Sequence, residues 1–160
     1  MKNLQVFAEQ AMGRRINLLF RLTMRYLRLE LKKLGIGAGD YPFLAILFFM
    51  PGLSQDELSR QMHVDKSYTA RAIAKLEKMG LAERRPDPEN HRIKRVFLTR
   101  KAKDMEPETL SVFENWHQTL IRDIDPDHLV IIRDGMDKMM ENAMMCLYDE
   151  ILPPFYRKPL

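Results

Sequence analysis

The sequence between residues 54 and 99 contains two short helical segments separated by a break, and this feature constrains the fold most. Ser54 is followed three residues later by Glu57, a spacing typical of a capping box at a helix start. After a break at 63–64, Asp65 is placed to cap a second helix, which Gly80 can end in a left-handed conformation. Two helices joined by a turn of about four residues form a helix-turn-helix.

A hairpin is predicted directly after the second helix. Residues 81–85 form one candidate strand and residues 92–98 the other, with Val96 and Leu98 on one face. The connecting residues 86–91 are rich in turn formers, and two prolines among them discourage edge-to-edge pairing. A hairpin in this position is the wing of a winged helix.

Two helices are expected before the helix-turn-helix. Apolar residues recur at three- and four-residue steps from about Leu4 to Leu34, and glycines end the pattern. A helix of about thirty residues is longer than usual in a globular protein, which indicates that it spans a partner chain. Asp40 is then placed to cap a short, very apolar helix over residues 41–50, which we expect to be buried on most sides.

Two more helices are expected after the hairpin. Thr99 can cap the first, which runs to about residue 123 and should kink at Pro107. An Asp-Pro pair at 125–126 opens the second, which ends near residue 151 ahead of an extended, proline-containing tail. A heptad-like seam on this last helix is formed by Leu129, Ile132, Met136, Met139, Ala143, Cys146 and Glu150.

Positive charge is concentrated in the second helix and the hairpin. The whole chain has a net charge of only +4, but residues 66–95 hold nine basic residues against four acidic ones. A basic stretch over a helix and a ribbon is typical of a nucleic-acid-binding protein. The pattern therefore indicates double-stranded DNA as a partner, because an α-helix fits the major groove.

These observations predict a mainly α-helical protein with a small β-wing. A winged helix-turn-helix DNA-binding domain occupies residues 40–99, and residues 1–34 and 100–160 form a helical dimerisation region. The chain has twelve methionines, several of them in the last helix, and methionine suits an adaptable hydrophobic interface between two copies.

Composition argues against several other kinds of protein. Of the 160 positions, 46% are hydrophobic and 30% charged, which is ordinary for a folded domain. The single Cys146 rules out an internal disulfide, and no Cys/His cluster has metal-site spacing, so we expect no metal and no cofactor. The chain shows neither a secretory signal nor a membrane-length apolar run, so we expect a cytoplasmic protein without a membrane partner.

The chain resembles the MarR family of transcriptional regulators over residues 12–152. The positions that carry the resemblance are Asp65-Lys66-Ser67, Thr69, Leu76-Glu77, Gly80-Leu81, Arg85, Asp87-Pro88, Arg92 and Leu98-Thr99. The resemblance implies a homodimeric winged-helix repressor. It also implies that a small lipophilic or aromatic molecule releases the repressor from a pseudo-palindromic operator.

The tip of the hairpin departs from the family pattern. The family usually has Asp-Arg-Arg where this chain has Asn90-His91-Arg92. The aspartate often pairs with an arginine and steadies the wing. The sequence leaves open whether Asp87 or Glu89 takes over this role.

Candidate DNA-binding residues lie on both helices and on the hairpin. They are Ser54, Gln55, Lys66, Ser67, Tyr68, Thr69, Arg71, Lys75, Arg84, Arg85, Arg92, Lys94 and Arg95. Near the start of the second helix, Arg71 suits guanine, and the hydroxyls of Ser67 and Thr69 suit bases or phosphate. Tyr68 either contacts a thymine methyl or packs against its own module. Lys75, one turn farther on, contacts phosphate or nothing.

The remaining candidates suit the DNA backbone or the minor groove. The N–H groups at Ser54 and Gln55 suit a phosphate. By resemblance, Arg92 enters the minor groove, where narrow A·T-rich segments attract guanidinium groups. Four other basic residues then line the wing for phosphate contact: Arg84, Arg85, Lys94 and Arg95. The alternative for a basic hairpin is a solvated edge that charge protects from pairing.

An effector pocket between the long helices and the winged module is also implied by the resemblance. Its candidate lining residues are Tyr26, Phe43, Leu47, Trp116 and His117, each of which is alternatively part of the core. Some relatives sense oxidants through cysteine. Cys146 lies in the predicted seam, which favours a buried, inert thiol.

Two other classes of function are alternatives to a DNA-binding regulator. The four histidines are scattered, and the chain has no nucleophile motif and no phosphate-binding glycine loop, so we expect no enzyme. A winged helix can also be a protein-interaction scaffold without a specific operator. The basic recognition face argues against a scaffold, and the salt dependence of DNA binding separates the two.

Overall fold

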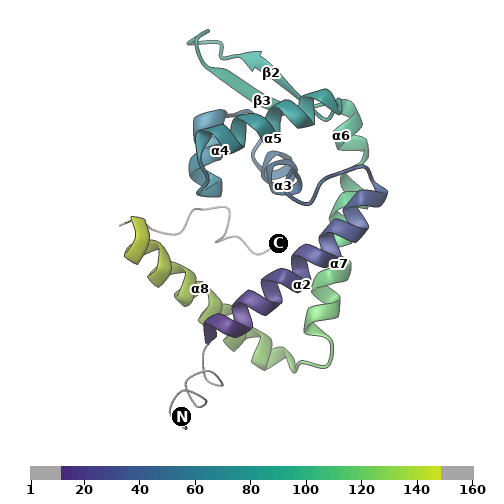
Figure 1. The fold of residues 1–160 in the computed structure, drawn as a ribbon, viewed down its shortest axis with the longest axis vertical. Helices are drawn as coiled ribbons and strands as arrows, with labels where there is room; N and C mark the ends of the chain where they lie inside the picture. Colours follow the sequence, from purple (N-terminus) through teal and green to yellow (C-terminus); the bar gives the residue numbers. More distant parts are fainter. Residues whose placement is uncertain (1–11, 149–160) are drawn as a thin grey trace.

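The computed structural model describes residues 12–148, which form a winged helix flanked by long helices (Figure 1). The elements follow the chain as α2 (Met12–Lys33), α3 (Tyr41–Phe49), β1 (Leu53–Ser54), α4 (Gln55–Met62), α5 (Lys66–Lys78), β2 (Ala82–Pro86), β3 (Lys94–Leu98), α6 (Arg100–Asp104), α7 (Glu106–Ile121) and α8 (Pro126–Tyr148). The expected beginning of the first helix, Glu150 of the seam and the proline-containing tail lie outside the described residues. The predicted fold class, mainly α with a small β-wing, is confirmed.

Local capping fixes where the two helices of the helix-turn-helix begin. The Ser54 hydroxyl accepts the Glu57 N–H at 3.3 Å, and the Glu57 carboxylate accepts the Ser54 N–H at 2.7 Å. Asp65 accepts the Tyr68 N–H at 2.7 Å and so caps α5. Gly80 follows α5 in a left-handed conformation, with φ +69°. The predicted capping box, second cap and terminating glycine are all confirmed.

Asp40 does not cap α3 in the predicted way. Its backbone has φ −90° and ψ −27°, whereas a capping side chain normally extends from a β-region backbone. The carboxylate pairs instead with the Lys75 ammonium of α5. A contact between distant parts of the chain has overridden the local pattern.

The sheet has three antiparallel strands rather than the expected two. The order is β1-β3-β2, and the two-residue β1 adds itself to the hairpin with Ser54 opposite Arg95. Strands of two residues carry no alternation, so nothing in the sequence marked β1. β3 begins at Lys94 rather than at residue 92 because the tip forms a turn closed by the Ile93 N–H on the Asn90 carbonyl at 2.8 Å.

The short helix α3 lies in the centre of the winged module. Four of its side chains, Phe43, Leu44, Ile46 and Leu47, are at most 1% exposed, so the prediction of a helix buried on most sides is confirmed. They pack in one core with side chains of α2, α5 and β3. Burial of each such side chain stabilises the fold by about 1.5–3 kcal/mol, which holds α5 and the hairpin in a fixed relation.

The predicted helix over residues 99–123 is divided in two. The Thr99 hydroxyl caps α6 by accepting the Ala102 N–H at 3.3 Å, and Met105 separates α6 from α7. Pro107 then lies in the first turn of α7, where proline is tolerated. The predicted kink is therefore a complete break between two helices.

The flanking helices pack unequally on the rest of the chain. α2 packs on α7 (Figure 1). The Trp116 indole N–H donates to the Thr23 hydroxyl at 3.0 Å, and its ring stacks on Tyr26 with centroids 4.7 Å apart. α8 instead leads away from α7, and Met144 is its one buried residue among those described. Between residues 12 and 148, no helix is long and apolar enough to cross a membrane.

Candidate nucleic-acid interface

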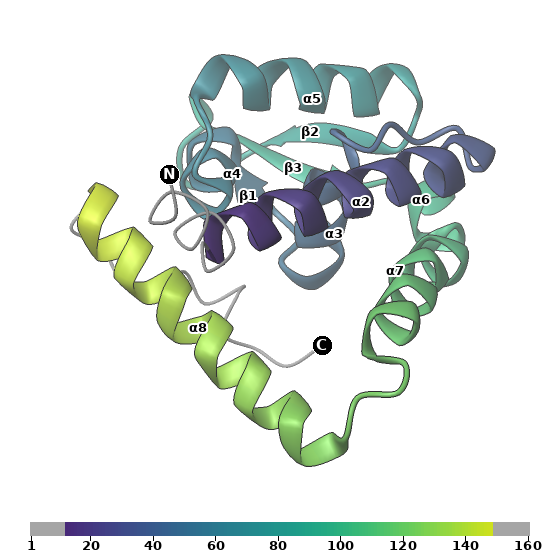
Figure 2. The same cartoon turned by 60° about the horizontal axis from the view of Figure 1, so that its bottom comes forward.

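The outer face of α5 is available to a groove of DNA. Figure 2 shows α5 and α8 on opposite sides of the molecule. The buried residues of α5 are Thr69, Ala72, Ile73 and Leu76. Lys66, Ser67 and Arg71 are exposed near its beginning. These three residues have the position from which a recognition helix reaches base edges.

Thr69 is not on this face, and its assignment to the DNA surface is corrected. Its side chain is fully buried. Its hydroxyl donates to the Asp65 carbonyl at 3.3 Å and lies 2.9 Å from the Ser59 hydroxyl of α4. Thr69 precedes Ile73 by four residues and Leu76 by seven, so helical periodicity was the signal that would have placed it inside. Thr69 joins the two helices of the helix-turn-helix to each other.

The contacts of Tyr68 favour packing against its own module over contact with a thymine methyl. Its hydroxyl donates to the Gly39 carbonyl at 3.2 Å, and its ring lies against Phe43 with centroids 5.8 Å apart. The residue is 37% exposed. Tyr68 therefore connects α5 to the loop before α3.

Lys75 and Arg84 are also turned toward their own module. Lys75 pairs with Asp40, whose side chain is only 10% exposed. Arg84 pairs with Glu77 across the gap between the wing and α5, and both side chains are about three-quarters buried. Each ion pair competes with a contact to DNA phosphate, which stays a prediction for Arg84 and one of the two alternatives for Lys75, whose side chain is 56% exposed.

At the start of α4 the Ser54 N–H, one of the two predicted phosphate donors, is already bound to the Glu57 carboxylate at 2.7 Å. The Ser54 hydroxyl is used in the capping box, and the Gln55 side chain is half-buried. Lys66 of α5 pairs with Asp56 of α4 at 2.9 Å, and both side chains are mostly exposed. Other backbone N–H groups of these first turns are therefore the phosphate donors that the geometry offers.

Asp87 stabilises the wing tip. One of its carboxylate oxygens accepts the N–H groups of Glu89 and Asn90, both at 2.9 Å, and the other pairs with the Arg95 guanidinium. Asn90 uses its side-chain oxygen locally, accepting the Arg92 N–H at 3.1 Å. Arg95, followed by the two N–H groups, holds the pKa of the Asp87 carboxyl below its ordinary value. Asp87, and not Glu89, takes over the role of the missing aspartate.

Arg95 is a structural residue and not the predicted phosphate contact. Its guanidinium donates to the Gly52 carbonyl at 2.9 Å and lies 3.6 Å from the Glu57 carboxylate, in addition to its pair with Asp87. About two-thirds of its side chain is buried. No local pattern in the sequence distinguished Arg95 from its neighbour Lys94, because its partners are far away along the chain.

The outer wing keeps three basic side chains. Arg85 pairs with Glu83 on its own strand and lies 4.9 Å from the centroid of the Phe97 ring. Arg92 and Lys94 are exposed, and their side chains make no ion pair or hydrogen bond with any residue of the described range. The same is true of Arg71 on α5 within residues 12–148. Among the predicted DNA-binding cations, Arg71, Arg92 and Lys94 are therefore unpaired within residues 12–148.

The five predicted pocket residues are packed in the protein or lie at its surface. Phe43 and Leu47 belong to the core, Tyr26 and Trp116 stack on each other, and His117 is exposed. None of them borders the two cavities of about 680 and 370 Å³. The structure therefore supports the core alternative for Phe43 and Leu47.

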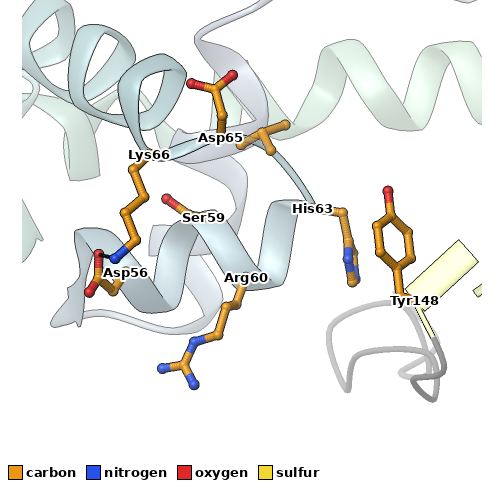
Figure 3. Close-up of a pocket in the computed structure, with 8 residues that line it drawn as sticks. Asp56, Ser59, Arg60, His63, Asp65, Lys66 and Tyr148 are labelled. Carbon is orange, nitrogen blue, oxygen red and sulfur yellow. Dashed lines mark ion pairs between the residues drawn. The ribbon is translucent and has the colours of Figure 1, made fainter.

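The larger cavity is an open groove between the turn of the helix-turn-helix and the end of α8 (Figure 3). Its lining residues are Asp56, Ser59, Arg60, His63, Val64, Asp65, Lys66 and Tyr148. The His63 and Tyr148 rings face each other across it, with centroids 5.1 Å apart.

Neither a metal site nor a buried thiol is evident in the described part of the chain. Residues 12–148 contain no group of three His, Cys, Asp or Glu side chains placed to hold a metal ion. Cys146 is exposed in the single chain. The predicted burial of its thiol therefore depends on a partner covering α8.

A helix-turn-helix followed directly by a hairpin, with cations on its outer face, defines a winged helix-turn-helix protein. A model of the MarR family matches residues 39–94. The crystal structure of a MarR transcriptional regulator from Methanosarcina mazei Go1 superposes with a TM-score of 0.79 at 34% identity, covering 84% of this chain and 97% of that one. The chain belongs to the MarR family of transcriptional regulators.

Two other relatives describe the extent of the similarity. YybA of Bacillus subtilis (strain 168), described as an uncharacterised HTH-type transcriptional regulator, is 35% identical over 94 residues. That match spans 59% of this chain and 63% of YybA. A putative MarR-family regulator from Listeria monocytogenes, crystallised with a 26mer DNA, has the same fold, with a TM-score of 0.78 at 23% identity over 83% of this chain and 89% of that one.

Proposed function

We propose that this protein is a sequence-specific DNA-binding repressor that acts as a homodimer on a pseudo-palindromic operator. The observation that carries the proposal is the set of outward-facing polar side chains in two places, Ser67 and Arg71 on α5 and Arg92 and Lys94 on the wing. An arginine near the start of a recognition helix suits the O6 and N7 atoms of guanine. An arginine at a wing tip suits a narrow minor groove.

The first turns of α4 and α5 add anchors for phosphate. Both helices begin with N–H groups that carry partial positive charge. Lys66 strengthens this region, because its ion pair with Asp56 is exposed and a phosphate can replace the carboxylate. Backbone anchors of this kind fix the register of a protein on the duplex while the side chains of α5 and the wing select the sequence.

The dimer is supported by apolar side chains that the single chain leaves exposed. On α2 these include Ile16, Leu18, Leu19, Phe20, Leu22 and Leu29, and on α8 Val130, Ile131, Ile132, Met136, Met139, Met145 and Leu147. Exposed apolar surface on this scale marks an interaction site. We assign residues 1–34 and 100–160 to dimerisation and residues 40–99 to DNA binding. Two recognition helices about 34 Å apart then read successive major grooves.

Release by a small lipophilic or aromatic ligand is the regulatory part of the proposal. The ligand is placed between the long helices and the winged module, close to the Tyr26 ring, which stacks on the Trp116 ring. Trp116 is the only tryptophan in the chain, so its fluorescence reports ligand binding directly.

The proposal is tested by selecting bound duplexes from a random-sequence library. We expect enrichment of two half-sites related by an approximate two-fold axis and separated by about one helical turn. Recovery of duplexes without any sequence preference, from a correctly folded protein, contradicts a specific operator and favours the scaffold alternative.

A further inference from the structure

The Arg95 guanidinium joins three segments that are far apart in the sequence. It donates to the carbonyl of Gly52, in the turn before β1, at 2.9 Å. It lies 3.6 Å from the carboxylate of Glu57, in the first turn of α4. It also pairs with Asp87, whose side chain is 8% exposed, in the loop of the wing. One side chain thus contacts the helix-turn-helix and the wing at the same time.

Each carboxylate that Arg95 contacts is itself fixed to the backbone. Glu57 accepts the Ser54 N–H at 2.7 Å, and this bond holds the start of α4. Asp87 accepts the N–H groups of Glu89 and Asn90, and these bonds shape the wing tip. The contacts therefore form a continuous connection from the first turn of α4 to the residues next to Arg92.

We propose that Arg95 is a positioning residue that sets the distance and angle between the wing-tip Arg92 and the recognition helix α5. The proposal rests on the proposed function, because it concerns how two DNA-reading elements are held together. Arg95 touches no DNA in this account. It acts through Asp87, and its effect is to let Arg92 and the α5 side chains engage their grooves simultaneously.

The physical reason for such a residue is the weakness of an isolated hairpin. Beyond β1, which pairs only with Arg95 and Val96, the wing is a two-stranded ribbon that is marginally stable by itself, and its tip projects beyond the sheet in Figure 1. Ordering a mobile tip on binding costs conformational entropy, and a tip that is already ordered avoids this cost. Arginine suits the task because its planar fork donates in several directions, which the single ammonium of lysine cannot reproduce.

The first experiment is a double-mutant cycle that joins Arg95 and Arg92. Affinity is measured by fluorescence anisotropy on a duplex chosen by the library selection, at one salt concentration. We expect Arg92→Ala to weaken binding about tenfold in the otherwise native protein. In the Arg95→Lys background, we expect the same change to weaken binding less than about twofold, because an unpositioned Arg92 has little affinity to lose.

Arg71→Ala on α5 is the matched control for the cycle. Its cost should be the same with Arg95 or Lys at position 95, because Arg71 does not depend on the wing. A general loss of stability changes the affinity cost of both alanine substitutions. A positioning role changes only the cost of Arg92→Ala. Equal costs of Arg92→Ala in the two backgrounds overturn the proposal.

The second experiment needs no DNA and follows amide hydrogen exchange in the dimer. In Arg95→Lys, the amides of Glu89 and Asn90 should exchange at least about tenfold faster, while that of Ile73 in α5 keeps its native rate. Arg85→Lys, which changes the neighbouring strand, should alter none of these rates. Unchanged exchange at Glu89 and Asn90 overturns the proposal.

The two experiments separate this inference from the proposed function. If the native protein binds no duplex, the proposed function fails and the positioning role fails with it. If the native protein binds DNA but the cycle is additive, the proposed function stands and only the role of Arg95 is overturned. Coupling in the Arg92 cycle together with faster exchange at the wing tip supports the role.

Discussion

The Lys75 ammonium of α5 pairs with the Asp40 carboxylate, which lies immediately before α3. The pair connects the recognition helix to the loop that leads out of α2. Its surroundings are tight, because a Cβ added at Gly37 would overlap the Asp40 carboxylate and lie 2.9 Å from the Lys75 nitrogen.

Lys75→Met should lower the stability of the protein without weakening its binding to DNA. The change leaves the mostly buried Asp40 carboxylate without its cation, at a cost of about 1–2 kcal/mol in the free energy of unfolding. Lys78→Met is the control, since Lys78 is exposed on the same helix, and it should change stability little. Urea denaturation at a fixed protein concentration measures the stability of both variants. Unchanged stability with lower DNA affinity would restore the phosphate contact first predicted for Lys75.

Thr69→Val and Ser67→Ala should have opposite consequences. The Thr69 hydroxyl is buried beside that of Ser59, so its loss should cost about 1 kcal/mol of stability while the folded protein still binds DNA. Ser67 is exposed, so its loss should weaken DNA binding and leave stability unchanged. The reverse pattern would mean that α5 is rotated from the orientation described.

Acid should destabilise the wing through Asp87. The pKa of this carboxyl is lowered in the folded protein, first by Arg95 and then by the N–H groups of Asn90 and Glu89. A lowered folded pKa stabilises the fold above the ordinary pKa of about 4 and loses this effect as the pH falls through the folded value. The free energy of unfolding should therefore decrease below about pH 5. In the Asp87→Asn variant it should decrease less steeply over the same range. If the stabilities of the native protein and of Asp87→Asn depended on pH in the same way, the role of Asp87 would be contradicted.

Ile132→Glu should convert the dimer to a monomer. Ile132 is 46% exposed in the single chain, so the change costs little within one copy but places a charge in the proposed interface. Asp134→Ser, on the same helix, should leave the dimer intact. Sedimentation equilibrium measures the mass. A native protein that sediments as one chain at micromolar concentration would remove the basis of the two-fold operator.

The sequence was most informative where the relevant contacts are short in range. The caps at Ser54, Asp65 and Thr99 are formed with residues three positions away, and all three were predicted. The hairpin after α5 was predicted for a similar reason, because strand, loop and strand are consecutive. The apolar pattern of α3 was sufficient to predict its burial.

Apart from Thr69, the sequence was least informative about charged groups, several of which have partners far away along the chain. Asp40 and Lys75 are 35 positions apart, and Arg95 and Gly52 are 43 apart. Composition identified these side chains as basic or acidic but gave no way to pair them. Three of the basic candidates on the predicted DNA face, Lys75, Arg84 and Arg95, are engaged in intramolecular ion pairs that the sequence did not reveal.

The most direct test of the account is the salt dependence of binding to duplex DNA, with Arg92→Ala compared to the native protein. We predict that the logarithm of the affinity falls linearly and steeply with the logarithm of salt concentration, through release of counterions. Arg92→Ala should weaken binding and reduce this slope by about one, while Arg84→Gln, whose native side chain pairs with Glu77, should leave the slope unchanged. Binding that does not vary with salt, or that is indifferent to Arg92, would contradict the assignment of α5 and the wing to DNA.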